Sequence, residues 1–132
     1  MRTRTKARQR AIEALFEAEQ RGVSVREVLE RNPSVNEYAV DLAQDTEAHI
    51  NRLNEVIETY AQEWNVSRFP AVDRAIMRVA VAELMLRPEI DTAVIISEAV
   101  EIANTLSTEE SAGFINGVLG KIAIVRSSLT SL

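Results

Sequence analysis

The residues best suited to do chemistry are five cationic side chains at the start of the chain, and their chemistry is the neutralisation of phosphate. They are Arg2, Arg4, Lys6, Arg8 and Arg10, and no acidic residue stands among the first ten. The remaining 122 residues hold 10 Lys and Arg against all 20 Asp and Glu. A basic segment joined to an acidic body favours contact with nucleic acid. Five cations engaged on a single strand would give log K a slope of about −3.5 against log[salt]. Charge alone leaves a second interpretation open, a solvated basic tail without a binding role.

Residues for catalysis or metal binding are scarce. The chain has no Cys and a single His, His49, which excludes thiolate nucleophiles, disulfides and the usual zinc sites. Its 4 Gly residues form no phosphate-binding loop, and no Ser stands in a nucleophile elbow. The many carboxylates fall on the solvated faces of predicted helices. We therefore predict a binding protein that has no enzyme activity, no metal and no cofactor.

One stretch, residues 71–86, must lie at the centre of the fold. Twelve of its sixteen residues are apolar and are spread almost all the way round a helix, so neighbours must cover it on most sides. Pro70 suits the first turn, and Pro88 stops the helix. The polar residues of the stretch mark either a face left uncovered by the chain or a buried pair; they are Asp73, Arg74, Arg78 and Glu83.

The remaining elements are predicted to be helices packed around this one. Capping patterns predict helix starts at Ser24, at Asp91 or Thr92, and within Ser107-Thr108-Glu109-Glu110. Further helices are predicted over 7–20, 36–48 and 50–64. Ile96, Ala99, Val100, Ala103 and Leu106 are expected to face inward, and the tail after Val125 is expected to be frayed. The predicted fold is all-α, with about seven helices in two packed bundles that share the central helix. We expect a single domain over 1–132 with a basic arm over 1–10.

Three positions carry more specific expectations. Continuing the first helix back to Arg2 would put Arg4 and Arg8 on its apolar side, where unpaired cations are costly, so the arm is expected to project from the body. Trp64 and Phe69 are interpreted as packing residues that hold the corner before the central helix, with RNA stacking as the alternative. Gly117, inside a helix, is expected to allow another backbone to approach closely.

No stretch is apolar enough to span a membrane, and three glutamates follow the basic start where a signal peptide would need an uncharged segment. The absence of Cys suits a reducing compartment. We predict a cytoplasmic protein.

Three stretches carry the most specific motifs of the chain. They are the Arg-rich start running into AIEALF (11–16), FPAVDRAIMRVA (69–80), and EAVEIA (98–103) followed by SAGFINGVL (111–119). Together they resemble the NusB family of bacterial transcription antitermination factors. The resemblance covers nearly the whole chain, and the last stretch is its most specific part. It implies an all-α fold of two bundles and a complex with the ribosomal protein NusE. That complex would bind boxA RNA and modify RNA polymerase against termination.

The resemblance also implies roles for individual residues. RNA contact falls to the arm (Arg2, Arg4, Lys6, Arg8, Arg10) and to Glu110 and Phe114, and partner binding falls to Asp73, Arg74 and Arg78. Phe16 stands where Tyr is common in the family. Some members self-associate, so a homodimer stays open. The same fold also begins an RNA cytosine methyltransferase, but a chain of 132 residues without an α/β domain favours a free-standing factor. The alternative function is a helical interaction scaffold or homodimer without specific RNA binding.

Overall fold

The structure, a computed structural model, describes residues 3–33, 36–61 and 68–130, and these residues form helices and short connections without a strand. The helices in this part of the chain are α1 (Thr3–Arg21), α2 (Val25–Arg31), α3 (Glu37–Ala48), α4 (Ile50–Ala61), α5 (Ala71–Leu86), α6 (Thr92–Leu106), α7 (Glu109–Ile124) and α8 (Arg126–Thr130). The all-α prediction is confirmed, and the count is close to the seven expected. None of these helices is long and apolar enough to cross a membrane.

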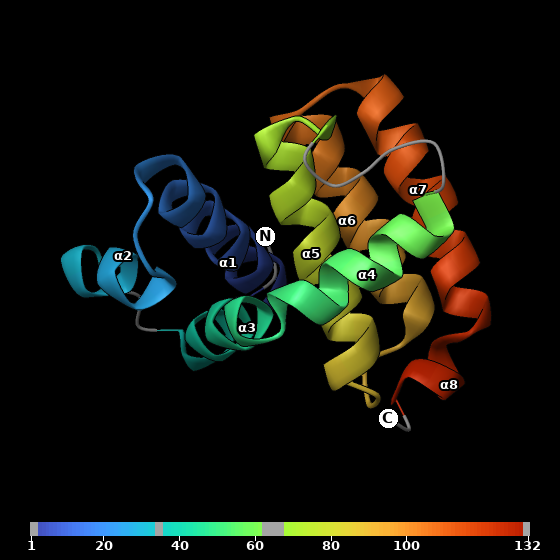
Figure 1. The fold of residues 1–132 in the computed structure, drawn as a ribbon, viewed down its shortest axis with the longest axis horizontal. Coiled ribbons are helices and arrows are strands. Elements are labelled where there is room, and N and C mark those ends of the chain that lie inside the picture. Colours follow the sequence, from blue (N-terminus) through green and yellow to red (C-terminus); the bar gives the residue numbers. More distant parts are fainter. Residues whose placement is uncertain (1–2, 34–35, 62–67, 131–132) are drawn as a thin grey trace.

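Helix α5 is the element that the others share. It contacts α1 and α3 on one side and α4, α6, α7 and α8 on the other, and Figure 1 shows it between these two groups, with α4 crossing its front. Its buried residues face all directions, as predicted, and they include Ile76, Met77, Val81 and Leu84. One continuous apolar core therefore holds both bundles.

Local capping explains where several helices begin. The side chains of Ser24, Asn36 and Thr108 accept hydrogen bonds from backbone N–H groups three residues further on, at 3.0–3.1 Å. These bonds satisfy donors that the first turn of a helix leaves without partners. The cap at Ser24 was predicted. The helix predicted from Asn36 begins one residue later with Asn36 as its cap, and Thr108 is the cap within the capping box predicted over residues 107–110. His49 ends α3, and its Nδ1 lies 2.8 Å from the carbonyl oxygen of Asp45.

One expectation about packing was right only in part, and two were wrong. Helix α6 buries Ala99 and Ala103 as expected, and Ile96 and Val100 pack partly against the core. Ile95 and Ile102 are buried as well, whereas Leu106 is 40% exposed. The helix lies between α5 and α7, and because apolar residues occur on most of its sides, spacing alone did not fix the buried arc.

Gly117 and the tail also differ from expectation. No atom lies within 4 Å of the position a Cβ would take on Gly117, so this glycine allows no close approach. The chain after Val125 forms α8 and is not frayed through Thr130. Arg126 holds it in place through hydrogen bonds to the end of α5 and the start of α6.

Candidate nucleic-acid and protein interface

The basic segment is part of helix α1 and does not project from the body. The helix begins at Thr3, and Ala7 and Arg8 in its second turn are 1% and 3% exposed. The expectation of a projecting arm was wrong for residues 3–10, because Arg8 finds partners inside the fold. Arg2 lies outside the described residues.

Arg8 is the centre of a buried group of charges. Its Nε donates to Oε1 of Glu83 at 2.6 Å, and its Nη1 donates to Oε1 of Glu98 at 2.8 Å. Burial disfavours the charged form, but the hydrogen bond and the negative charge of Glu83 outweigh it and raise the pKa of Arg8. With two carboxylates against it, Arg8 is not a free cation for neutralising phosphate.

Two hydroxyls complete this group. Tyr38 donates to Oε2 of Glu83 at 2.6 Å, and Thr5 donates to Oε1 of Glu98 at 2.5 Å. Burial raises the pKa of the Tyr38 hydroxyl, and the neighbouring Glu83 carboxylate raises it further. Of the polar residues on the central helix, Glu83 is therefore the one that marks a buried pair.

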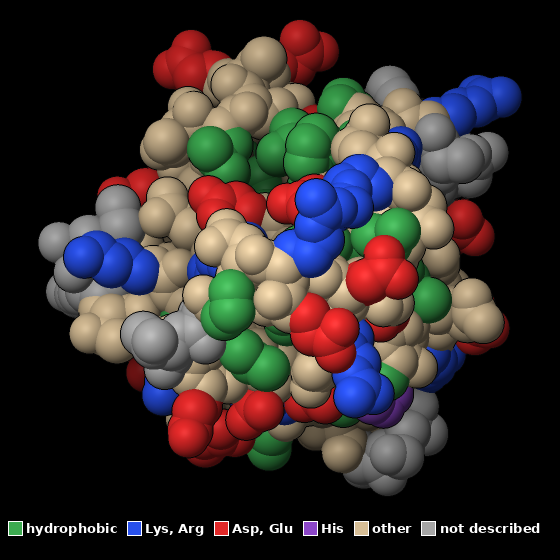
Figure 2. Space-filling model, turned by 90° about the vertical axis from the view of Figure 1, so that its left-hand side faces the viewer, with side chains coloured by type: hydrophobic (Ala, Val, Ile, Leu, Met, Phe, Trp, Pro, Cys, Tyr) green, Lys and Arg blue, Asp and Glu red, His purple; other side chains and the backbone are tan. Residues whose placement is uncertain are grey.

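The other basic residues of α1 reach its surface in different directions. The guanidinium carbon of Arg4 lies 4.1 Å from the centre of the Tyr38 ring, a cation–π contact. Lys6 is exposed, and Arg10, one turn further on, donates to the carbonyl oxygen of Asn32 at 2.8 Å. The face of the molecule that carries α1 and α2 mixes basic, acidic and hydrophobic side chains (Figure 2), so any RNA contact here is local.

Phe114 lies near the opposite end of α1 from Arg4, and Glu110 is about one turn before it on α7. Phe114 packs edge-on against Phe69, with ring centres 5.3 Å apart and planes at 86°. Phe69 is 4% exposed, as expected of a packing residue, whereas Trp64 lies outside the described residues. The guanidinium of Arg74 joins this corner to the end of α1, since it bonds both the Phe69 carbonyl and Glu19. Arg4 and Glu19 are fifteen residues apart on α1, a separation of about 22 Å along the helix.

An apolar groove of about 820 Å³ lies between the outer face of α1, the start of α5 and the end of α6. Two exposed hydrophobic side chains border it, Phe16 at 38% and Leu106 at 40% exposure. Glu13 and Glu17 add negative charge on the α1 side, while Arg10 and Asn32 also line the groove. Exposed apolar surface with a charged rim is typical of a site for another protein. The groove was not predicted from the sequence, because Leu106 was expected to face inward.

The predicted partner-binding residues of α5 lie beside this groove but are mostly engaged within the chain. Arg74 pairs with Glu19, and Arg78 donates to Glu19 at 2.9 Å and to Asn54 at 2.9 Å. These two arginines therefore tie α1 and α4 to α5, and the interpretation of an uncovered face was wrong for them.

Asp73 differs from its neighbours on α5. It is 4% exposed, and its Oδ1 has no hydrogen-bond partner within the described part of the chain. A buried carboxylate oxygen without a donor is costly. Asp73 directly follows Val72, which lines the groove, but Asp73 itself does not line it.

The pair of arginines makes stability depend on the charge of Glu19. The hydrogen bond from Arg74 lowers the pKa of Glu19 below its ordinary value of 4.5; partial burial opposes this, and Arg78 adds to the lowering. Unfolded Glu19 therefore takes up its proton at a higher pH than folded Glu19, and its contribution is lost as pH falls through the folded pKa.

We expect Glu19→Gln to lower the free energy of unfolding near pH 7 by up to about 1 kcal/mol, since the site is partly exposed. The difference from the native chain should shrink as the pH falls below 4.5. Urea titrations at several pH values measure it, with Glu30→Gln on the exposed pair with Arg26 as the control. A difference that grows toward low pH would contradict the pairing.

Comparisons with known proteins find relatives that match almost the whole length of this chain. The model of the NusB family matches residues 5–124. The transcription antitermination protein NusB of Kineococcus radiotolerans is 43% identical over 99% of this chain and 100% of its own.

Solved structures of related proteins share this fold. NusB of T. maritima superposes with a TM-score of 0.82 at 31% identity, covering 94% of this chain and 93% of that one. A chain from the crystal structure of the antitermination factors NusB and NusE in complex with double-stranded RNA also gives 0.82, at 28% identity over 95% of this chain and 98% of that one. The prediction of two helical bundles around a shared helix is confirmed.

Proposed function

This chain belongs to the NusB family, and from that membership we propose that it is an RNA-binding transcription antitermination factor that acts together with NusE. The observation that carries the proposal is a likeness over nearly the full length of both chains to the protein solved with NusE and double-stranded RNA. The function is one of binding, without catalysis, and belongs in the bacterial cytoplasm, where transcripts are made.

On the RNA side we propose that Arg2, Arg4, Lys6 and Arg10 neutralise phosphates. Lys6 and Arg10 are one turn apart on the outer stripe of α1, which suits two neighbouring phosphates. Glu110 and Phe114 would contact a more distant part of the same RNA, because they lie toward the other end of α1. Arg8 holds the first two turns of α1 in place through Glu83 and Glu98.

On the protein side we propose that the groove beside Phe16 and Leu106 binds NusE. The acidic rim supplied by Glu13 and Glu17 suits a basic partner, as ribosomal proteins generally are. Asp73 would support that site from within the first turn of α5, while Arg74 and Arg78 hold α1 and α4 against α5. The RNA would be of boxA type, and the complex would act on RNA polymerase.

The test is fluorescence anisotropy of labelled boxA-type RNA, titrated with the protein alone and with equimolar NusE. A scrambled RNA provides the specificity control. We expect binding that tightens with NusE and discriminates against the scrambled RNA. Equal binding of both RNAs in the presence of NusE would reject the proposal.

We expect Lys6→Ala to weaken RNA binding at low salt and to reduce the slope of log K against log[salt] by about 0.7, the value for one phosphate on a single strand. Lys121→Ala is the matched control, since Lys121 is an exposed lysine on α7, eleven residues beyond Glu110. Equal slopes for the native chain and Lys6→Ala would show that Lys6 contacts no phosphate.

The exposed groove also favours a second candidate, a protein-interaction scaffold or homodimer without specific RNA binding. Deleting residues 1–10 is a poor test, because Ala7 and Arg8 belong to the core. The double substitution Lys6→Ala with Arg10→Ala leaves the core intact. If that variant keeps full cellular activity and its partner, the scaffold interpretation is supported.

A further inference from the structure

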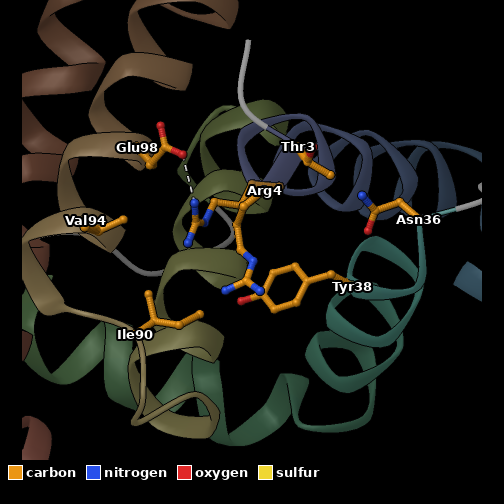
Figure 3. A pocket seen from close by; sticks show the side chains of 8 residues that line it. Thr3, Arg4, Asn36, Tyr38, Ile90, Val94 and Glu98 are labelled. Atoms are coloured by element: carbon orange, nitrogen blue, oxygen red, sulfur yellow. Dashed lines mark hydrogen bonds and ion pairs between the residues drawn. The ribbon is translucent and has the colours of Figure 1, made fainter.

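A second cavity, of about 430 Å³, lies where the first turns of α1 meet the starts of α3 and α6. In Figure 3, Arg4 reaches over the Tyr38 ring, and Ile90 and Val94 lie across the cavity from them. Its volume falls in the range of small-molecule sites, about 300–1,000 Å³. None of the roles described above uses it.

One hydrogen-bond donor of a largely buried side chain remains unused at this cavity. Arg8 lines it and is 3% exposed, and its Nε and Nη1 are bonded to Glu83 and Glu98. Among the described residues no acceptor is bonded to its Nη2. The cavity therefore offers a fixed donor to a ligand atom that carries a lone pair.

The charges around the cavity point to a neutral ligand. The positive charges of Arg4 and Arg8 are balanced by the carboxylates of Glu83 and Glu98. A phosphate would gain little net attraction here and would meet the carboxylate of Glu98, which lines the cavity. A neutral group with acceptor atoms on its edge would not be repelled.

The walls favour a flat ligand. The Tyr38 ring with the Arg4 guanidinium at 4.1 Å forms one wall, and the aliphatic side chains of Ile90 and Val94 form the other. Val94 is 39% exposed, so the cavity is open at this side. RNA-binding proteins hold unstacked bases against aromatic rings and guanidinium planes in this way.

We propose that this cavity takes one unstacked base of the bound RNA, with an acceptor edge toward Nη2 of Arg8 and its face against the Tyr38–Arg4 pair. The proposal rests on the RNA-binding function and adds a base contact to a surface otherwise described by phosphate neutralisation. Because phosphate contacts read no sequence, a base held here would contribute directly to RNA selection.

The first test fills the cavity. Val94→Phe puts a ring into it, whereas Ala93→Phe adds the same ring at a neighbouring exposed position of α6 that does not line the cavity. In anisotropy titrations with boxA-type RNA, we expect Val94→Phe to weaken binding about tenfold, in line with the loss of one stacked base, and Ala93→Phe to bind as the native chain. Thermal unfolding of both variants checks that they are folded.

The second test compares two cations. Arg4→Gln and Lys6→Gln each remove one exposed positive charge from α1, but only Arg4 contributes to the cavity wall. The loss of RNA affinity in Lys6→Gln should become smaller as the salt concentration rises. Part of the loss in Arg4→Gln should persist, because salt does not screen stacking. The salt-resistant part of the loss in Arg4→Gln should add little to the loss in Val94→Phe, since both substitutions prevent base binding at the same site.

A scan of RNAs with one abasic nucleotide each locates the base, because every such RNA keeps all its phosphates. We expect one position at which the abasic RNA binds the native chain about tenfold more weakly than the intact RNA does. Val94→Phe should bind that abasic RNA and the intact RNA equally.

If the native chain binds the RNA and Val94→Phe binds it equally well, the cavity proposal is overturned while the proposed function stands. If the native chain binds no RNA even with NusE, the function itself fails. If Val94→Phe weakens the binding of a free mononucleotide but not the binding of the RNA, the cavity is a nucleotide site and the RNA assignment is overturned.

Discussion

Arg8→Ala is expected to lower the free energy of unfolding by about 3–5 kcal/mol, because it leaves the carboxylate of Glu83 buried without its cation. Glu83 is 1% exposed and would keep only the hydroxyl of Tyr38 as a donor. A loss of this size is a large fraction of the stability of an ordinary domain, about 5–15 kcal/mol. Urea denaturation followed by circular dichroism measures it.

Two further variants separate the charge effect from a general loss of packing. Arg21→Ala removes a cation from the same helix, but its pair with Glu17 is exposed, so about 0.5 kcal/mol is expected. The double substitution Arg8→Met with Glu83→Met removes both buried charges and should be more stable than Arg8→Ala alone. Similar small losses for Arg8→Ala and Arg21→Ala would mean that the buried pair does not hold α1.

The consequence for function follows from where Arg8 lies. The first two turns of α1 carry Arg4 and Lys6, and Arg8 fixes these turns to α5 and α6 through Glu83 and Glu98. Loss of RNA binding in Arg8→Ala would thus accompany a loss of helix, and it should not be interpreted as loss of a phosphate contact.

Arg126→Ala is expected to lower the free energy of unfolding by about 3 kcal/mol, because one guanidinium satisfies four acceptors. Its nitrogens donate to the carbonyl oxygens of Leu84, Arg87 and Ile90 at 2.8–2.9 Å and to the hydroxyl of Thr92 at 2.7 Å. Carbonyls at the end of a helix have no partner within the helix, so the guanidinium takes that place for α5. The melting temperature should fall by about 10 °C.

The conservative variant is the sharper probe of this site. Arg126→Lys keeps the charge but cannot direct donors to four acceptors at once, so most of the loss should remain. Arg26→Ala is the surface control, since the Arg26 side chain is 81% exposed. A melting temperature in Arg126→Ala equal to that of Arg26→Ala would show that α8 is not anchored by this residue.

Much of the fold follows from rules that act within a few residues. Helix α5 is apolar on all sides between two prolines, and such a segment is stable only inside other helices, so its central place was predictable. The caps at Ser24, Asn36 and Thr108 are local hydrogen bonds spanning three residues and were also predictable.

The candidate site could be predicted only in part. The sequence determined an all-α binding protein whose cations are concentrated at its start, and the motif stretches indicated the family. Which cations are free depended on contacts across the chain, since Arg8 meets partners 75 and 90 residues away. The inner face of α6, the ordered α8 and both cavities likewise arise where distant helices meet. Local spacing records a helix's own periodicity, whereas burial and ion pairing depend on which neighbour each face receives.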